Sequence, residues 1–338
     1  MSETSNTTIT RVYSWQENQW QNYLKARAAD HLPHALLLTG CDGIGKSEFA
    51  TLLANSLLCE QVDSEGYACG ECKSCKVKKS NAHPDFKHVG LPDGKQQIPV
   101  NAIRELTDFL ILSRSYGGYR VVVISAADKM NINAANSLLK SLEEPPPKTV
   151  IILVADQFTQ LPATIRSRCQ LIVMNKPDQA VSLAWLEQQN LQHSTGKMLS
   201  LADNKPLLAK SLDANESLLD ERNKFAKDLL AVLQQSQSIT TVAKNWEKND
   251  LNRLLNWQLK WLHAVAKMLL VSGDDNLSTN KFLAQIISSI NNPESLWKLY
   301  ADLLHLKSMT DYPLNRLMFT ESMLLLWRDV GRPQGHLY

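Results

Sequence analysis

The first residues that could do chemistry lie at positions 40–47, where the sequence reads GCDGIGKS. This matches the pattern G-x-x-x-x-G-K-[ST] of a phosphate-binding loop, whose glycines let backbone N–H groups wrap phosphate oxygens. The lysine of such a loop reaches the outer phosphates, and the hydroxyl that follows it faces Mg²⁺. We expect ATP or ADP with Mg²⁺ to be the ligand that this loop could hold. The candidate nucleotide-binding residues are Gly40, Gly43, Gly45, Lys46 and Ser47.

Efficient hydrolysis needs acidic residues that this chain lacks at the expected place. A phosphate-loop enzyme holds Mg²⁺ with an aspartate near the end of a neighbouring strand and orients the attacking water with a further polar residue. Here the candidate strand at residues 121–124 is followed by Ser125-Ala126-Ala127, and the first carboxylate is Asp128. We expect Asp128 to point elsewhere and to cap the following turn. The sequence therefore predicts nucleotide binding without efficient turnover.

A second group with chemical potential is a set of four closely spaced cysteines. Cys59, Cys69, Cys72 and Cys75 form the pattern C-x9-C-x2-C-x2-C. Two consecutive C-x2-C steps bring thiolates close enough for a tetrahedral Zn²⁺, and four sulfurs leave no open position for catalysis. The pattern predicts a structural zinc ion that stabilises a glycine- and lysine-rich segment. The other two cysteines, Cys41 and Cys169, are expected to be ordinary small side chains.

The elements that position these groups follow from the periodicity of apolar residues. Strand and helix patterns alternate from residue 36 to residue 174, which predicts a doubly wound α/β domain with a parallel sheet. Beyond it every pattern is helical, so the fold class is α/β plus all-α. We expect three domains, at 1–174, 175–212 and 213–338, with the cysteines in an insertion at 59–79.

Composition excludes several classes of protein. Lys and Arg total 36 against 34 Asp and Glu, and this net charge of +2 predicts no strong general attraction to nucleic acid. The start, MSETSNTTIT, lacks the features of a signal peptide, and the apolar runs VVVI and VIILVA are too short to cross a bilayer. We expect a cytoplasmic protein with no membrane contact.

Five segments together resemble one known family. They are LPHALLLTG with the phosphate loop, the four cysteines, HPDF at 83–86, the stretch YRVVVISAADKMNINAANSLLKSLEEPP, and LPATIRSRC at 161–169. On these segments the chain is similar to the delta-prime family of bacterial DNA polymerase III clamp-loader subunits, which are AAA+ proteins. The segments cover the predicted first domain, whereas the C-terminal helices carry no motif.

The resemblance implies a fold, a set of partners and an activity. It implies an AAA+ domain with a zinc knuckle, a small helical lid, and a helical collar that joins a heteropentameric ring with gamma/tau (DnaX-type) motor subunits and a delta subunit. That ring loads the sliding clamp onto primed DNA as part of the DNA-directed DNA polymerase holoenzyme. The family's Ser-Arg-Cys motif, at residues 167–169, further implies that Arg168 is a catalytic arginine finger acting in trans on a neighbour's ATP. Arg166 is a weaker candidate nearby.

Two alternatives stay open. The first is a DnaX-like motor ATPase, which shares the phosphate loop and the cysteines. Family motor subunits carry Asp-Glu where this chain has Ser125-Ala126, and a lid arginine where it has Leu207, so both features favour the delta-prime family. The second is a zinc-dependent nucleic-acid-binding protein, suggested by the lysines around the cysteines and in which the phosphate loop is vestigial.

Overall fold

The chain divides into two compact units. The computed structural model describes residues 11–80, 82–92, 95–270, 281–289, 293–310, 312 and 314–330. The first unit is Met1–Ala214 and the second is Asn215–Tyr338. The finer division of the first unit after residue 174 stays a prediction.

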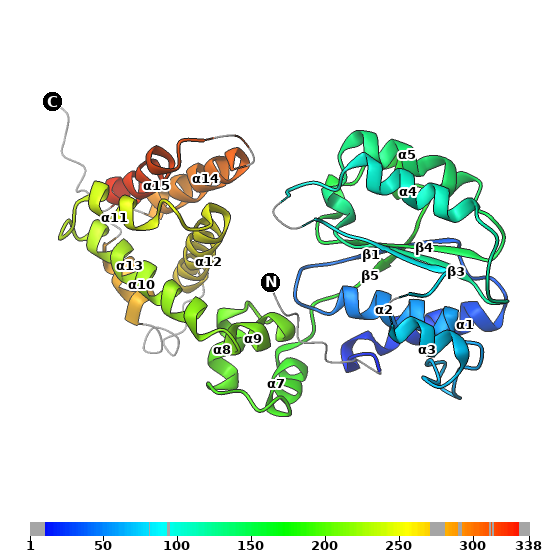
Figure 1. The fold of residues 1–338 in the computed structure, drawn as a ribbon. Helices are drawn as coiled ribbons and strands as arrows, with labels where there is room; N and C mark the ends of the chain where they lie inside the picture. The colour runs from blue at the N-terminus through cyan, green and yellow to red at the C-terminus, as the bar shows by residue number, and fades with distance from the viewer. Residues whose placement is uncertain are drawn as a thin grey trace. The chain divides into compact units, whose positions relative to one another are not determined.

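A five-stranded parallel sheet forms the centre of the first unit (Figure 1). Its strands pair in the order β2-β3-β4-β1-β5, so the predicted α/β class is confirmed. Three strands read as continuous apolar runs because helices cover both faces of the sheet. The strands are β1 (Ala35–Thr39), β2 (Phe86–Val89), β3 (Arg120–Ile124), β4 (Thr149–Ala155) and β5 (Gln170–Val173).

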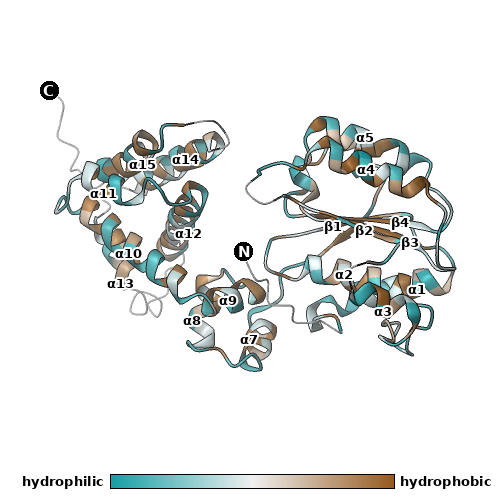
Figure 2. Ribbon diagram, in the orientation of Figure 1, coloured by the Kyte–Doolittle hydropathy of each residue, from teal (hydrophilic) through white to brown (hydrophobic). Residues whose placement is uncertain are grey.

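Two helical layers cover the sheet, and alternate strand residues face each layer (Figure 1). Leu36 and Leu38 pack with α1 (Glu17–Ala28) and α2 (Lys46–Leu58), whereas Leu37 packs with α4 (Val100–Ile111) and α5 (Ile132–Glu143). This alternation follows from the period of two in a strand. Figure 2 shows the hydrophobic strands between the two layers.

Short elements complete the first unit. The cysteine segment carries the helix α3, and a group of three helices closes the unit. The elements are η1 (Ser14–Gln16), α3 (Lys73–Lys79), η2 (Ala127–Lys129), η3 (Phe158–Gln160), α6 (Ala163–Arg166), α7 (Gln179–Glu187), α8 (Thr195–Leu201) and α9 (Pro206–Asp213).

The described part of the second unit is entirely helical, as the sequence predicts. Its core contains the buried indoles of Trp257, Trp261 and Trp327, and Trp327 donates a hydrogen bond from Nε1 to Gln258 Oε1 at 2.6 Å. Among the described residues, no helix combines the length and the apolarity that crossing a bilayer requires. The helices are α10 (Glu216–Leu233), α11 (Ile239–Trp246), α12 (Leu251–Leu270), α13 (Lys281–Ser289), α14 (Pro293–Met309) and α15 (Arg316–Val330).

Candidate functional site

The phosphate loop lies where its chemistry requires, between the end of β1 and the start of α2. Gly43 and Gly45 have φ angles of +71° and +91°, a region that side-chain-bearing residues rarely adopt. A Cβ on Gly43 would also come within 2.8 Å of Leu208 Cβ. The loop and α9 together line a pocket of about 310 Å³ that also includes Asp156. The backbone conformation of the loop therefore requires glycine at both positions.

The lysine of the loop already has protein partners. Lys46 Nζ lies 2.6 Å from Asp156 Oδ1 and donates a hydrogen bond to the carbonyl oxygen of Cys41 at 2.5 Å. Asp156 directly follows β4, which places it beside the loop at the carboxyl end of the sheet. Sequence reasoning missed Asp156, although its place at the end of a buried strand next to β1 was a signal.

The residues after β3 do not supply the missing carboxylates. Ser125 Oγ lies 2.9 Å from His88 Nε2 on the neighbouring strand β2. Asp128 accepts a hydrogen bond from the backbone N–H of Asp156 at 3.3 Å, and it is 8% exposed. Neither residue lines the pocket at the phosphate loop. In this structure Asp128 therefore fixes the backbone that carries Asp156.

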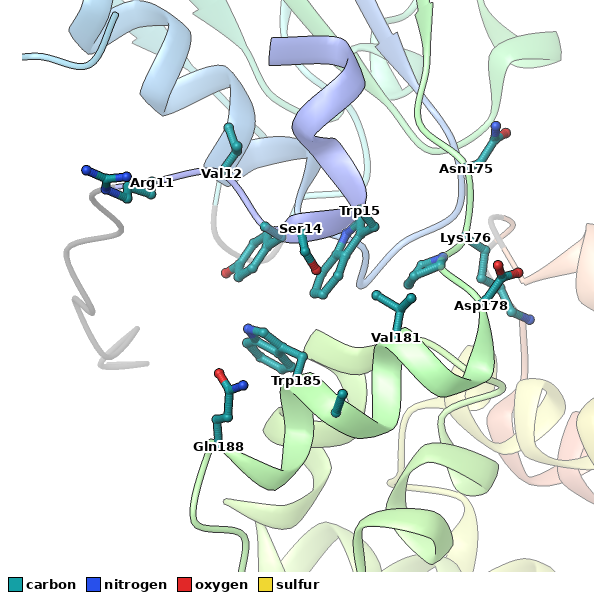
Figure 3. Close-up of a pocket in the computed structure, with 13 residues that line it drawn as sticks. Arg11, Val12, Ser14, Trp15, Asn175, Lys176, Asp178, Val181, Trp185 and Gln188 are labelled. Carbon is teal, nitrogen blue, oxygen red and sulfur yellow. The ribbon is translucent and has the colours of Figure 1, made fainter. Parts of the chain in front are cut away.

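The segment before α1 also binds the phosphate loop. Trp15 Nε1 donates to the carbonyl oxygen of Ile44 at 2.9 Å, and Gln16 Nε2 donates to the carbonyl oxygen of Gly45 at 2.9 Å. The Tyr13 ring stacks on Trp15 with 4.7 Å between centroids, and Trp185 of α7 meets both rings edge-on. The three rings line a pocket of about 940 Å³. Figure 3 shows Trp15 and Trp185 in this pocket. No pattern in the sequence predicts this aromatic cluster, because its rings come from segments far apart along the chain.

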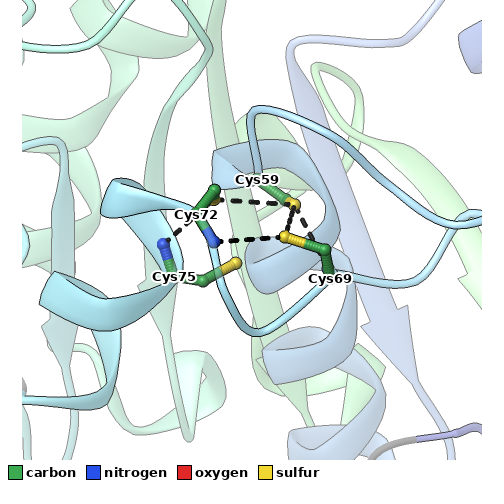
Figure 4. A group of neighbouring side chains, drawn as sticks. All are labelled: Cys59, Cys69, Cys72 and Cys75. Atoms are coloured by element: carbon green, nitrogen blue, oxygen red, sulfur yellow. Dashed lines mark hydrogen bonds between the residues drawn. The ribbon is translucent and has the colours of Figure 1, made fainter.

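The four cysteines meet at one point, as their spacing predicts (Figure 4). Their Sγ atoms all lie within 4.8 Å of one another, and Cys59 Sγ is 3.6 Å from Cys69 Sγ and 4.0 Å from Cys72 Sγ. A tetrahedral Zn²⁺ with bonds of ~2.3 Å separates its sulfurs by ~3.8 Å. The cysteine set, completed by Cys75 on α3, could therefore hold a metal ion such as zinc.

Hydrogen bonds and burial affect the four thiols differently. Backbone N–H groups of Glu71 and Cys72 lower the pKa of the Cys69 thiol to about 7. Burial raises the pKa of Cys59 and of Cys75. The Cys69 thiol therefore loses its proton more readily than the Cys59 and Cys75 thiols do.

The HPDF motif at residues 83–86 connects the cysteine segment to the sheet. His83 Nε2 lies 2.8 Å from Ser74 Oγ on α3, and His83 Nδ1 accepts from the N–H of Asp85 at 3.1 Å. Asp85 pairs with Arg120 at 3.2 Å and accepts the N–H of Tyr116 at 2.8 Å. The motif is therefore explained by structural bonding.

Arg168 lies at the opposite end of the sheet from the phosphate loop of its own chain. It precedes β5, and the strand pairing sets Gln170 beside Leu36, whereas the loop begins only after Thr39. Because a strand rises ~3.3 Å per residue, this part of β1 separates the two groups by roughly 10 Å or more. Arg168 cannot act on a nucleotide in its own loop.

The Arg168 guanidinium makes an exposed ion pair in the isolated chain. Its Nη2 atom lies 2.6 Å from Oε1 of Glu143, the last residue of α5, and the two side chains are 35% and 48% exposed. Arg166 makes a cation–π contact instead, because its guanidinium lies 4.7 Å from the centroid of the Phe158 ring. Of the two arginines, Arg168 has the partner that solvent or an incoming anion can more easily replace.

Fold and site together define the class of protein. A phosphate loop after β1, in a parallel sheet with the order β2-β3-β4-β1-β5, belongs to a P-loop protein of the AAA+ class. The chain also carries the cysteine segment directly after α2.

Comparisons with known proteins identify the family within that class. Residues 15–178 match the family model described as DNA polymerase III, delta subunit. The chain is 31% identical to DNA polymerase III subunit delta' of Pseudomonas aeruginosa, over 95% of this chain and 99% of that one. Subunit delta' of Yersinia pestis is 29% identical over 93% and 95%. The chain belongs to the family of DNA polymerase III subunit delta'.

Solved structures were compared as well. A DNA polymerase III gamma subunit-related protein from Thermotoga maritima is 17% identical over 94% of this chain and 100% of that one, with a TM-score of 0.48.

Proposed function

We propose that this chain is a clamp-loader subunit that assists ATP-dependent loading of a sliding clamp onto primed DNA. It hydrolyses little or no ATP itself and lends Arg168 to the ATP site of an adjacent motor subunit. Its partners are gamma/tau-type motor subunits and a delta subunit in a heteropentameric ring, in the cytoplasm. The clamp and the DNA are reached through that assembly.

The position of Arg168 is the observation that carries this proposal. A guanidinium beside a γ-phosphate stabilises transition-state charge and contributes ~10³ to 10⁵ in rate. Arg168 lies far from its own loop, and its charge is paired with the exposed carboxylate of Glu143. Its Nη1 atom also donates to the carbonyl oxygen of Thr164 at 3.0 Å. The arrangement suits a phosphate that a neighbouring subunit brings to this end of the sheet.

The loop of this chain lacks the groups that turnover requires. Ser125 and Asp128 are engaged with His88 and with the Asp156 backbone, and Leu207 lines the pocket where a motor subunit would place a cation. We infer that the loop has a structural role beside an adjacent motor subunit that hydrolyses ATP. The metal at the cysteines is a structural zinc, because four sulfurs close its coordination shell.

The proposal is tested by clamp loading in a reconstituted loader. We expect loading onto primed DNA to fail when this chain is omitted, and to fall strongly when Arg168→Ala replaces the wild-type chain. Arg166→Ala is the matched control and should retain loading, since its guanidinium packs on Phe158. Full loading with Arg168→Ala would contradict the finger.

The two alternatives make different predictions for the isolated chain. Robust ATP hydrolysis that Lys46→Ala abolishes would identify a motor subunit. Salt-dependent DNA binding that is lost on mutation of the cysteines would identify a zinc-dependent nucleic-acid-binding protein.

A further inference from the structure

The lysine of the phosphate loop is paired with a carboxylate of the same chain. Lys46 is 4% exposed, and its ammonium group contacts Asp156 at 2.6 Å. The backbone of Asp156 is in turn held by Asp128. An ammonium group buried to this extent needs an anionic partner, and in this chain the partner is internal.

The charges around the pocket oppose a nucleotide. Three carboxylates line it, from Asp42, Glu48 and Asp156. Two ammonium groups balance part of this charge, since Lys46 pairs with Asp156 and Lys205 pairs with Asp42. A triphosphate entering the pocket must displace Asp156 and then lie beside carboxylates, which repel it at short range.

Protein contacts also join the two walls of the pocket. The N–H of Leu207 in α9 donates to the carbonyl oxygen of Gly43 in the loop at 3.2 Å, next to the Lys205–Asp42 ion pair. The ring of Trp185 in α7 meets the rings of Tyr13 and Trp15 edge-on, and Trp15 donates a hydrogen bond to the carbonyl oxygen of Ile44 in the loop. The phosphate loop and α9 are thus joined without a nucleotide between them.

We propose that Asp156 is the residue that excludes nucleotide from this intact phosphate loop. Its carboxylate pairs with Lys46 where a phosphate oxygen would otherwise do so. The loop then serves to connect the sheet to the helices α7 to α9. The proposal gives the complete phosphate-loop pattern a role in a chain whose strand β3 is not followed directly by a carboxylate. It rests on the proposed function, which makes the loop a scaffold.

The test measures binding of Mg-ATP to the isolated chain with a fluorescent ATP analogue. For the wild type we expect a dissociation constant above ~1 mM. Asp156→Asn keeps the shape, removes the charge, and should tighten binding at least ~10-fold, since it frees the buried Lys46 ammonium for a phosphate and removes a carboxylate that repels it. The double variant Asp156→Asn with Lys46→Ala should lose that gain.

Asp203→Asn is the matched control. Asp203 pairs with Lys176, its side chain is 58% exposed against 55% for Asp156, and it does not line the pocket. This variant should bind Mg-ATP as weakly as the wild type. Circular dichroism establishes that each variant is folded.

Thermal unfolding gives a second measurement. Asp156→Asn leaves the Lys46 ammonium without its carboxylate, so its melting temperature should fall and Mg-ATP should raise it again, while the wild type should not respond. Wild-type binding as tight as that of the variant would overturn the proposal, and so would a folded Asp156→Asn that gains no affinity. These measurements use the isolated chain, so they can fail independently of the Arg168 test in the assembled loader.

Discussion

At the scale of single residues, two ion pairs of similar geometry have different consequences. The Arg168–Glu143 pair is exposed on both sides, so its net contribution to stability is small, about 0 to 1 kcal/mol. An anion from another subunit can therefore replace Glu143 at little cost. The Lys46–Asp156 pair is buried on the lysine side, and breaking it leaves a desolvated charge. The Arg168 guanidinium can thus exchange its partner for an anion of another subunit, whereas the Lys46 ammonium stays paired within the chain.

A third pair, Asp85 with Arg120, is fully internal and serves stability. The two side chains are 1% and 2% exposed. Burial alone would raise the pKa of Asp85, but hydrogen bonds from Ser115, Tyr116 and Arg120 outweigh it and hold the pKa below the usual value. Arg120 also donates to the carbonyl oxygen of Ser113, so the pair fixes the loop that follows α4.

We predict that Asp85→Asn lowers the free energy of unfolding by about 3 kcal/mol at pH 7, because it leaves a buried guanidinium without its charge partner. Since the folded-state pKa is depressed, the carboxylate contributes its stability above about pH 4 and loses it as the pH falls through the folded-state pKa. Urea denaturation of both proteins at pH 7 and at pH 3 measures this difference. Asp108→Asn, on the exposed face of α4, is the control and should change little.

At the scale of elements, the cysteine segment has little regular structure of its own. It contains one short helix, α3, and its four sulfurs come from both ends of the segment. Tyr67 anchors this segment by stacking on Trp20, and a metal bound by the four thiolates would add to its folding free energy.

We predict one zinc ion per chain, measured by elemental analysis, and its loss in Cys72→Ser. Chelation of the wild type, or this substitution, should expose residues 59–79 to proteolysis while the parallel sheet remains folded. Cys169→Ser should keep its zinc, since Cys169 is outside the cluster. Unchanged protease resistance after complete metal removal would contradict a structural metal.

The strands that the sequence predicts are more deeply buried than the strand that sequence reasoning missed. The buried strands at 35–39, 120–124 and 149–155 were predicted because both of their faces are covered and their residues are apolar. Strand β2 was missed because only Val89 of its four residues is buried, so it carries neither an apolar run nor a clean alternation. Its position at the edge of the sheet explains that pattern.

The same physical reason limits what could be predicted at the site. The phosphate loop and the cysteines were found because their chemistry requires close spacing along the chain. Asp156 and Glu143 act on Lys46 and Arg168 through tertiary contacts, which no local pattern records. The aromatic contacts of Trp185 with Tyr13 and Trp15 depend likewise on distant segments meeting.

At the scale of the whole molecule, the chain combines a phosphate-loop α/β unit with a helical unit. Its α/β unit keeps the loop, and its second unit is helical in the part that the structure describes. A net charge of +2 gives the whole chain no strong attraction to DNA, which fits contact through an assembly.

The most direct test of this account compares two variants in the reconstituted loader. The quantity measured is the rate of ATP hydrolysis stimulated by clamp and primed DNA. We predict that Arg168→Ala lowers this rate by at least ~10-fold, because a neighbouring site loses its arginine, whereas Lys46→Ala leaves it within about twofold of wild type. The opposite outcome, an unchanged rate with Arg168→Ala and a collapse with Lys46→Ala, would show that this chain is itself a motor.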